Sequence, residues 1–145
     1  MRGTFLGFDF GTKYLGIAVG QAITQTARPL ITLHVNKGVP RWEQLDKIIQ
    51  EWEPEGLIVG LAMQPDGSHS STSNKAMKLG ESLKSHYNLP VYYIEERLTS
   101  VAAAERVKET APTSAIEKDL DAVAAAIILE SWLNANAKDK SNAPV

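Results

Sequence analysis

Acidic residues occur at three sites in apolar surroundings, where a charge is costly to bury. Asp9 lies at the end of one apolar run, Glu95 and Glu96 follow another, and Asp121 lies where a third begins. A buried carboxylate needs a partner or a metal ion, and carboxylate oxygens are suited to Mg²⁺ or Mn²⁺. Two such ions about 3.5–4 Å apart can activate a water and stabilise the leaving oxygen of a phosphodiester. If the acids meet, they predict metal-dependent phosphate chemistry.

Each acid has a simpler explanation when it is taken alone. Asp121 could be an acid in the first turn of a helix, where it favours the macrodipole. Glu96 could pair with Arg97 or Lys108, and Asp9 could anchor the turn that follows it. Spacing does not decide between these explanations, so the functional interpretation depends on a fold that brings the three acids together.

The pattern of apolar residues predicts the elements that would position them. Short β-branched or apolar runs indicate five strands, at 5–10, 15–19, 30–35, 57–61 and 91–94. Helical spacing predicts helices over 41–53, 75–87, 100–110 and 115–133, the last one starting at a capping box of Ser114 and Glu117. The serine-rich stretch 68–73 is typical of a flexible loop.

This order predicts an α/β fold with one mixed five-stranded sheet, three antiparallel strands followed by two parallel ones, flanked by helices. Its ligand site is expected at the carboxyl ends of the central strands.

Length and composition fit one folded domain. The 145 residues are 43% hydrophobic and carry a net charge of −2, and we expect a single domain over 1–137 with a flexible tail over 138–145. No apolar run is long enough to cross a membrane. The absence of cysteine suits a reducing compartment, so we expect the cytoplasm. The mild acidity gives no general attraction to nucleic acid, so a phosphate partner requires a local basic cluster or a metal ion.

Four motifs in order carry a resemblance to a known family. They are Leu6-Gly7-Phe8-Asp9-Phe10-Gly11-Thr12-Lys13, Ile58-Val59-Gly60-Leu61, Glu95-Glu96-Arg97-Leu98-Thr99-Ser100 and Asp121-Ala122-Val123-Ala124-Ala125. Together they strongly resemble the bacterial YqgF (RuvX) family, whose members are described as candidate Holliday-junction resolvases and as nucleases for the 5′ end of pre-16S ribosomal RNA. The resemblance covers about 5–133.

The resemblance implies a ribonuclease H-like fold, an rRNA precursor or branched DNA as substrate, and Mg²⁺ or Mn²⁺ held by Asp9, Glu96 and Asp121. The family usually has Asp where this chain has Glu95, and its usual Gly-Leu-Pro loop is Gly60-Leu61-Ala62 here. Alternation along a strand places Glu95 and Glu96 on opposite faces. We choose Glu96 for the site and keep Glu95 as the alternative.

Several other residues could contact the substrate. Lys13 and Arg97 could hold phosphates, and Thr99 could bind a phosphate or cap the next helix. A wider basic rim could consist of Arg28, Lys37, Arg41, Lys75 and Lys78, although a solvated surface explains these charges equally simply.

Two other classes of protein compete with a nuclease. The segment Asp9–Lys13 also resembles the first phosphate loop of the actin, sugar-kinase and Hsp70 superfamily, but those ATP-binding proteins close two such domains over a nucleotide. A non-catalytic nucleic-acid-binding factor could keep the same fold. Junction cleavage would require a symmetric homodimer, because two strands are cut.

Overall fold

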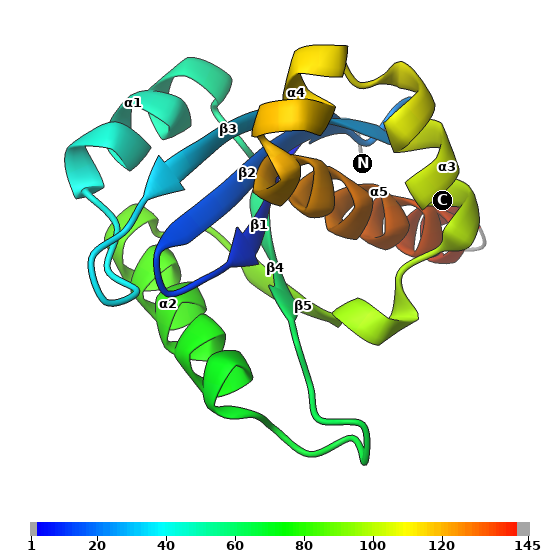
Figure 1. The fold of residues 1–145 in the computed structure, drawn as a ribbon. Coiled ribbons are helices and arrows are strands. Elements are labelled where there is room, and N and C mark those ends of the chain that lie inside the picture. Colours follow the sequence, from blue (N-terminus) through cyan, green and yellow to red (C-terminus); the bar gives the residue numbers. More distant parts are fainter. Residues whose placement is uncertain (1–2, 142–145) are drawn as a thin grey trace.

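The computed structural model describes residues 3–141, which are built around one sheet of five strands (Figure 1). The strands are β1 (Thr4–Phe10), β2 (Tyr14–Gln21), β3 (Thr26–His34), β4 (Gly56–Leu61) and β5 (Val91–Glu95). They lie in the order β3-β2-β1-β4-β5. β1, β2 and β3 pair antiparallel, whereas β4 joins β1 and β5 joins β4 in parallel. The predicted mixed sheet is therefore confirmed.

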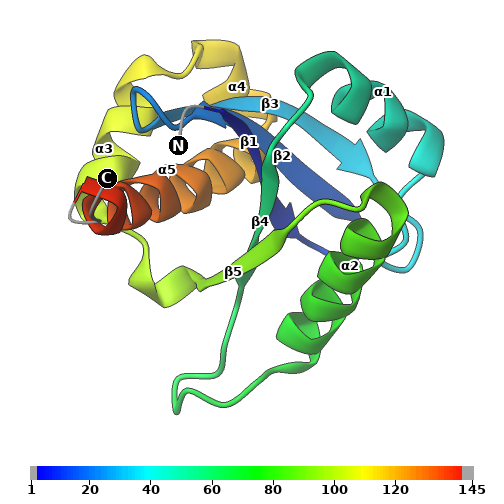
Figure 2. The same ribbon diagram turned by 180° about the vertical axis from the view of Figure 1, so that it is seen from behind.

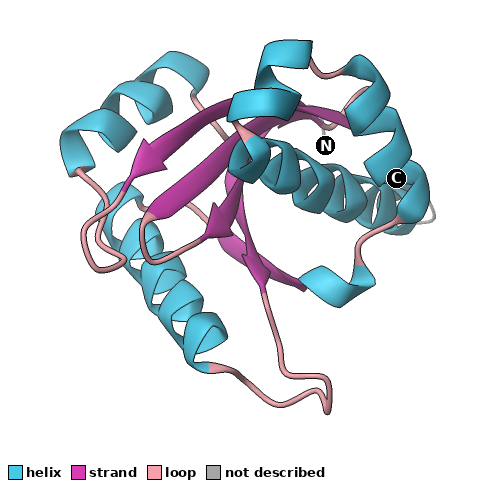
Figure 3. Cartoon of the chain, viewed as in Figure 1, coloured by secondary structure: helices cyan, strands magenta, loops and turns pink. Residues whose placement is uncertain are grey.

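Helices cover both faces of this sheet (Figures 2 and 3). One face carries α1 (Trp42–Trp52) and α2 (Ser71–Tyr87), and the other carries α5 (Leu120–Ser141) with α3 (Val101–Thr110) and α4 (Thr113–Lys118) beside it. A 3₁₀ turn, η1 (Glu96–Leu98), follows β5 directly. None of the helices within residues 3–141 combines the length and apolar composition needed to span a bilayer.

Alternation along the strands divides the core into two layers. Leu6 and Phe8 of β1 belong to the cluster under α1 and α2, whereas Phe5 of the same strand belongs to the cluster under α5. Strand side chains point to opposite faces with a period of two. The same rule places the side chain of Asp9 on the α5 face of the sheet.

The α5 face is lined with glycine, which lets the helix lie unusually close to the sheet. A Cβ atom on Gly7 would lie 2.7 Å from Cβ of Leu129 and 2.9 Å from the carbonyl oxygen of Ala125. The facing side of α5 is correspondingly small, with Ala122 and Ala125 fully buried. This apolar helix is therefore buried against the sheet.

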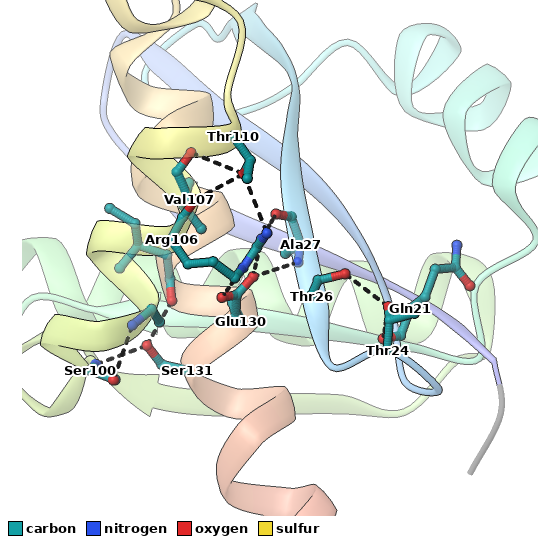
Figure 4. Close-up of polar contacts among 12 residues, drawn as sticks. Gln21, Thr24, Thr26, Ala27, Ser100, Arg106, Val107, Thr110, Glu130 and Ser131 are labelled. Carbon is teal, nitrogen blue, oxygen red and sulfur yellow. Dashed lines mark hydrogen bonds and ion pairs between the residues drawn. The ribbon is translucent and has the colours of Figure 1, made fainter.

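A buried ion pair joins α5 to α3 and to the edge strand β3 (Figure 4). Glu130, whose side chain is 2% exposed, pairs with Arg106. Glu130 Oε1 also accepts a hydrogen bond from Ala27 N–H at 2.8 Å, and Arg106 donates to the Ala27 carbonyl at 2.8 Å. A second link is made by Ser131, whose hydroxyl accepts from the Ser100 amide at 2.9 Å at the start of α3.

The prediction of one helix from Ala115 was wrong, because the chain forms two helices there. Asp119 leaves helical geometry at φ −122° and ψ 49°, which separates α4 from α5. Ser114 does not cap the helix; Pro112 precedes the first turn with φ −58°, and no side-chain hydrogen bond caps α4. Pro112 is itself the N-cap residue and is extended, with a ψ of 145°, so α4 begins without a capping hydroxyl. The break places Asp121 in the first turn of a new helix.

Two other boundaries differ from the prediction. β3 begins at Thr26 rather than near Leu30, because Gln25 adopts a left-handed conformation (φ 58°) and closes a short turn between β2 and β3. The serine stretch is not a simple flexible loop. Ser70 accepts from the Ser73 amide at 2.9 Å, and the Ser73 hydroxyl accepts from the Ser70 amide at 2.7 Å. This reciprocal cap starts α2 at Ser71.

The carboxyl-terminal helix α5 continues to Ser141, past the predicted end near Leu133. The predicted tail over 138–145 therefore overlaps the end of α5, and its last positions, 142–145, lie outside the described residues. The division into a domain and a flexible tail stays a prediction.

Candidate active site

Asp9 lies near the carboxyl end of β1, between two glycines of the neighbouring strands. In the sheet its partners are Gly16 on β2 and Gly60 on β4. Residues paired across neighbouring strands share a face of the sheet. The half-buried Asp9 side chain therefore has a glycine, which carries no side chain, as its neighbour on each adjacent strand. This leaves room for groups from other elements to approach Asp9.

Gly16 makes room for the start of α5. A Cβ atom on Gly16 would overlap the Asp121 carbonyl group and would lie 2.8 Å from the Ala122 nitrogen. This glycine therefore admits the amino terminus of a helix. Asp121 lies in the first turn of α5, where the positive end of the helix dipole favours an acid, as the simpler explanation from sequence proposed. The same positive end reduces the repulsion among the acids.

Gly60 makes room both for Ile128 of α5 and for Glu96. A Cβ atom on Gly60 would lie 2.5 Å from Cδ1 of Ile128 and 3.3 Å from Cγ of Glu96. β5 ends at Glu95, and Glu96 begins η1, so strand alternation no longer governs its direction. Glu95 instead pairs with Arg97, with 2.8 Å between Oε1 and Nε. The structure therefore brings Glu96 rather than Glu95 to Asp9. Arg97 forms its ion pair with Glu95, not with Glu96.

The three carboxyl groups interact electrostatically. Burial, followed by the charge of Glu96, a side-chain hydrogen bond with Glu96 and the charge of Asp121, raises the pKa of Asp9 from 3.8 to about 8. Asp9 forms no ion pair with a basic residue within the described part of the chain. At neutral pH it therefore holds a proton, which relieves the repulsion that three gathered carboxylates would otherwise produce.

No group of three or more His, Cys, Asp or Glu side chains among residues 3–136 is already arranged as a metal-binding cluster. The donor set nevertheless fits a hard divalent cation, since it consists of carboxylate oxygens converging on Asp9, a half-buried acid without an ion-pair partner among the described side chains. A cation would have to displace the Asp9 proton and draw the carboxylates closer together.

The raised pKa of Asp9 predicts an unusual pH dependence of stability. Folded Asp9 keeps its proton up to about pH 8, whereas the unfolded chain loses it near pH 4. Between these values the folded state binds more protons, so raising the pH should lower the free energy of unfolding by at most about 1.4 kcal/mol per pH unit. Urea unfolding in chelator at pH 5, 6 and 7 should give this slope for the wild type and a flatter one for Asp9→Asn. Equal slopes for the two proteins would contradict the shift.

The residues predicted to bind substrate surround this site with different roles. Lys13 is exposed in the β1–β2 turn, and Arg97, 57% exposed, pairs with Glu95. The Thr99 hydroxyl donates to the Glu96 carbonyl at 2.9 Å, so it fixes the backbone that carries Glu96. Ser100, not Thr99, caps α3, by accepting from the Ala103 amide at 3.2 Å.

Sequence reasoning did not assign the two glycines that admit the acids, or the role of Glu130. Gly16 and Gly60 looked like ordinary strand glycines, and only the register shows that both flank Asp9. Glu130 did carry a signal, because it follows the apolar run Ile127-Ile128-Leu129.

Comparison with known proteins identifies the family. The model of the RuvX family, described as "Holliday junction resolvase", matches residues 3–135. The chain belongs to the RuvX (YqgF) family. The match spans all five strands and the start of α5, so it includes every acid of the candidate site.

Relatives of this RuvX-family chain agree with the assignment. It is 46% identical over 129 residues to a protein of Pseudomonas paraeruginosa (strain PA7), a match covering 88% of this chain and 90% of the relative. It is 44% identical over 136 residues to a protein of Actinobacillus pleuropneumoniae serotype 5b, covering 93% and 99%. Both relatives carry the name "Putative pre-16S rRNA nuclease".

A solved structure supports the fold. RuvC of T. thermophilus in complex with a Holliday junction substrate superposes with a TM-score of 0.57 and 17% identity, covering 93% of this chain and 96% of RuvC. At this identity the likeness shows the fold alone, which is ribonuclease H-like as the sequence predicted.

Proposed function

We propose that this RuvX-family chain is a divalent-metal-dependent nuclease that hydrolyses phosphodiester bonds in structured nucleic acid, with the 5′ end of pre-16S rRNA as its substrate. The observation that carries the proposal is the convergence of Glu96 and Asp121 on the half-buried Asp9. The names of the curated relatives support the RNA substrate. The cysteine-free sequence suits the reducing cytoplasm, where we place the activity.

In this proposal Asp9, Glu96 and Asp121 hold one or two Mg²⁺ or Mn²⁺ ions. When bound, such ions supply activation of water and stabilisation of charge on the leaving oxygen. Asp9 gives up its proton as the site fills, and the first turn of α5 offsets part of the negative charge. Thr99 keeps Glu96 in position, while Lys13 and Arg97 contact neighbouring phosphates, Arg97 by exchanging Glu95 for a phosphate oxygen.

A cleavage assay with controlled metal tests the proposal. A labelled RNA containing the 5′ end of pre-16S rRNA should be cut in Mg²⁺ or Mn²⁺, should stay intact in EDTA, and should be cut again when excess Mg²⁺ is restored. Cleavage that persists in EDTA would end the metal proposal. Tight binding of the RNA without a metal-dependent product would favour a non-catalytic factor, and ATP binding in a calorimetric titration would favour the phosphotransferase alternative.

The family description favours one second candidate, a Holliday-junction resolvase. Symmetric junction cleavage would need a homodimer with two sites. A four-way DNA junction offered in the same assay should then give paired nicks, and the active species should sediment as a dimer. Cleavage of the RNA but not of the junction would reject this candidate.

A further inference from the structure

A basic pocket lies at the same end of the sheet as the three acids, but on the opposite face. Its floor is apolar, formed by Phe10, Trp42 and Leu79, and its rim carries Lys37, Lys75 and Lys78. Phe10 directly follows Asp9 on β1, so alternation sends their side chains to opposite faces of the sheet. The exposed β1–β2 turn, with Lys13, connects the two sites.

The shape of the pocket is fixed by a tight loop before α1. Asn36 and Val39 exchange backbone hydrogen bonds of 3.0 and 2.9 Å, and the Gly38 amide donates to the Thr12 carbonyl at 3.2 Å. Gly38 has a φ of 82°, and a Cβ atom there would lie 3.1 Å from the ring of Phe10. The loop is therefore held against the end of β1 that carries the acids.

The charges of the pocket have no ion-pair partner among the side chains of residues 3–136. All three lysines are exposed, no acidic residue lines the pocket, and none of the ion pairs in that range involves a lysine. In a chain with a net charge of −2, such a local excess of positive charge is complementary to phosphate. Three of the five residues of the predicted basic rim therefore do gather, around an apolar floor.

The pocket is too small for a whole cofactor. Its volume of about 180 Å³ is below the roughly 300–1,000 Å³ of pockets that enclose drug-sized ligands. It suits one flat ring of a longer chain that continues past it. An apolar and aromatic floor with cations at the rim is the combination that holds a base by stacking and its backbone by charge.

We propose that this pocket binds one unpaired nucleotide of the substrate strand, with its base on Phe10, Trp42 and Leu79 and its phosphates on Lys37, Lys75 and Lys78. The inference rests on the proposed nuclease function, because it places the pocket beside the cleavage site on a strand that crosses the β1–β2 turn. Such a contact would hold a single-stranded flank while the neighbouring phosphodiester lies at the acids.

Binding in EDTA tests the pocket without any cleavage. Fluorescence anisotropy with ten-nucleotide single strands, oligo-uridine and oligo-thymidine, should show about tenfold weaker binding for Lys75→Gln/Lys78→Gln. The slope of log affinity against log salt should fall by about 1.4, since each lost phosphate contact removes about 0.7 for a single strand. The matched control, Lys47→Gln/Lys84→Gln, removes two exposed lysines of α1 and α2 that do not line the pocket, and it should bind like the wild type.

A ten-unit abasic phosphodiester of the same charge tests the contact with the base. The wild type should bind it about tenfold or more weakly than the oligonucleotide, because stacking contributes about 1–3 kcal/mol per base. Equal losses in both lysine pairs, or equal affinity for the abasic chain, would overturn the proposal. If the wild type cleaves RNA but Lys75→Gln/Lys78→Gln binds the single strands as tightly as the wild type, only the pocket proposal is rejected. If the lysine and abasic tests support the pocket but the wild type cleaves no RNA, only the nuclease proposal is rejected.

Discussion

Asp9→Asn should abolish metal-dependent cleavage while leaving the fold intact. The substitution keeps the shape of the side chain but removes the negative charge that would hold the cation, so we expect the rate to fall by about 10³-fold, at the upper end of the loss seen for one transition-state-stabilising group. In metal-free protein at neutral pH the effect on stability should be small or favourable, because burial and the neighbouring acids already keep Asp9 protonated.

The measurement is cleavage of the labelled RNA at saturating Mg²⁺, together with urea unfolding of both proteins in chelator. Glu51→Gln is the matched control, because it removes one negative charge from the exposed surface of α1, and it should cleave at the wild-type rate. If Asp9→Asn retains cleavage within tenfold of the wild type, Asp9 is not in the catalytic site.

Arg106→Leu should destabilise the protein by about 3 kcal/mol. Removing one member of a buried pair leaves the other charge without compensation, which costs about 3–5 kcal/mol. We expect the lower end, because 35% of the Arg106 side chain is exposed and water can partly solvate the Glu130 carboxylate left behind. Thermal or urea unfolding at pH 7 measures the loss.

A double variant separates the buried charge from lost packing. Arg106→Leu/Glu130→Leu also removes the carboxylate and should be more stable than Arg106→Leu alone, although the Ala27 amide loses its acceptor at a cost of about 1–3 kcal/mol. If the double variant were the less stable of the two, the stranded charge of Glu130 would not be the cause of the loss.

The sheet could be predicted from sequence because each strand has a local signal. The run ending at Asp9 and the buried run 57–61 have the right length and composition, and the intervening helices force a parallel connection. The break between α4 and α5 had no comparable signal, because Ser114 and Glu117 mimic a cap while the chain turns at Asp119. The short turn at Gln25 was equally hidden, since a non-glycine residue with positive φ is rare.

The candidate site was predictable in its members but not in its construction. The unusual setting of Asp9, Glu96 and Asp121 is visible in the sequence, whereas the direction of Glu96 depends on η1 beginning directly after Glu95. The pairing of Asp9 with Gly16 and Gly60 depends on strand register. Register is set by the whole sheet, so no local motif carries it.

The glycine-lined part of the sheet beneath α5 has an evolutionary consequence. The glycines of the strands determine how closely α5 approaches the sheet. Substitutions at these glycines can therefore change the distances between the acids without altering any acid. A single methyl group at Gly60 would overlap with Ile128 of α5 and contact Glu96 closely. It would therefore change the space between the carboxylates in which an ion would bind. We therefore expect proteins of this fold that differ in metal preference to differ first at the small residues of these strands.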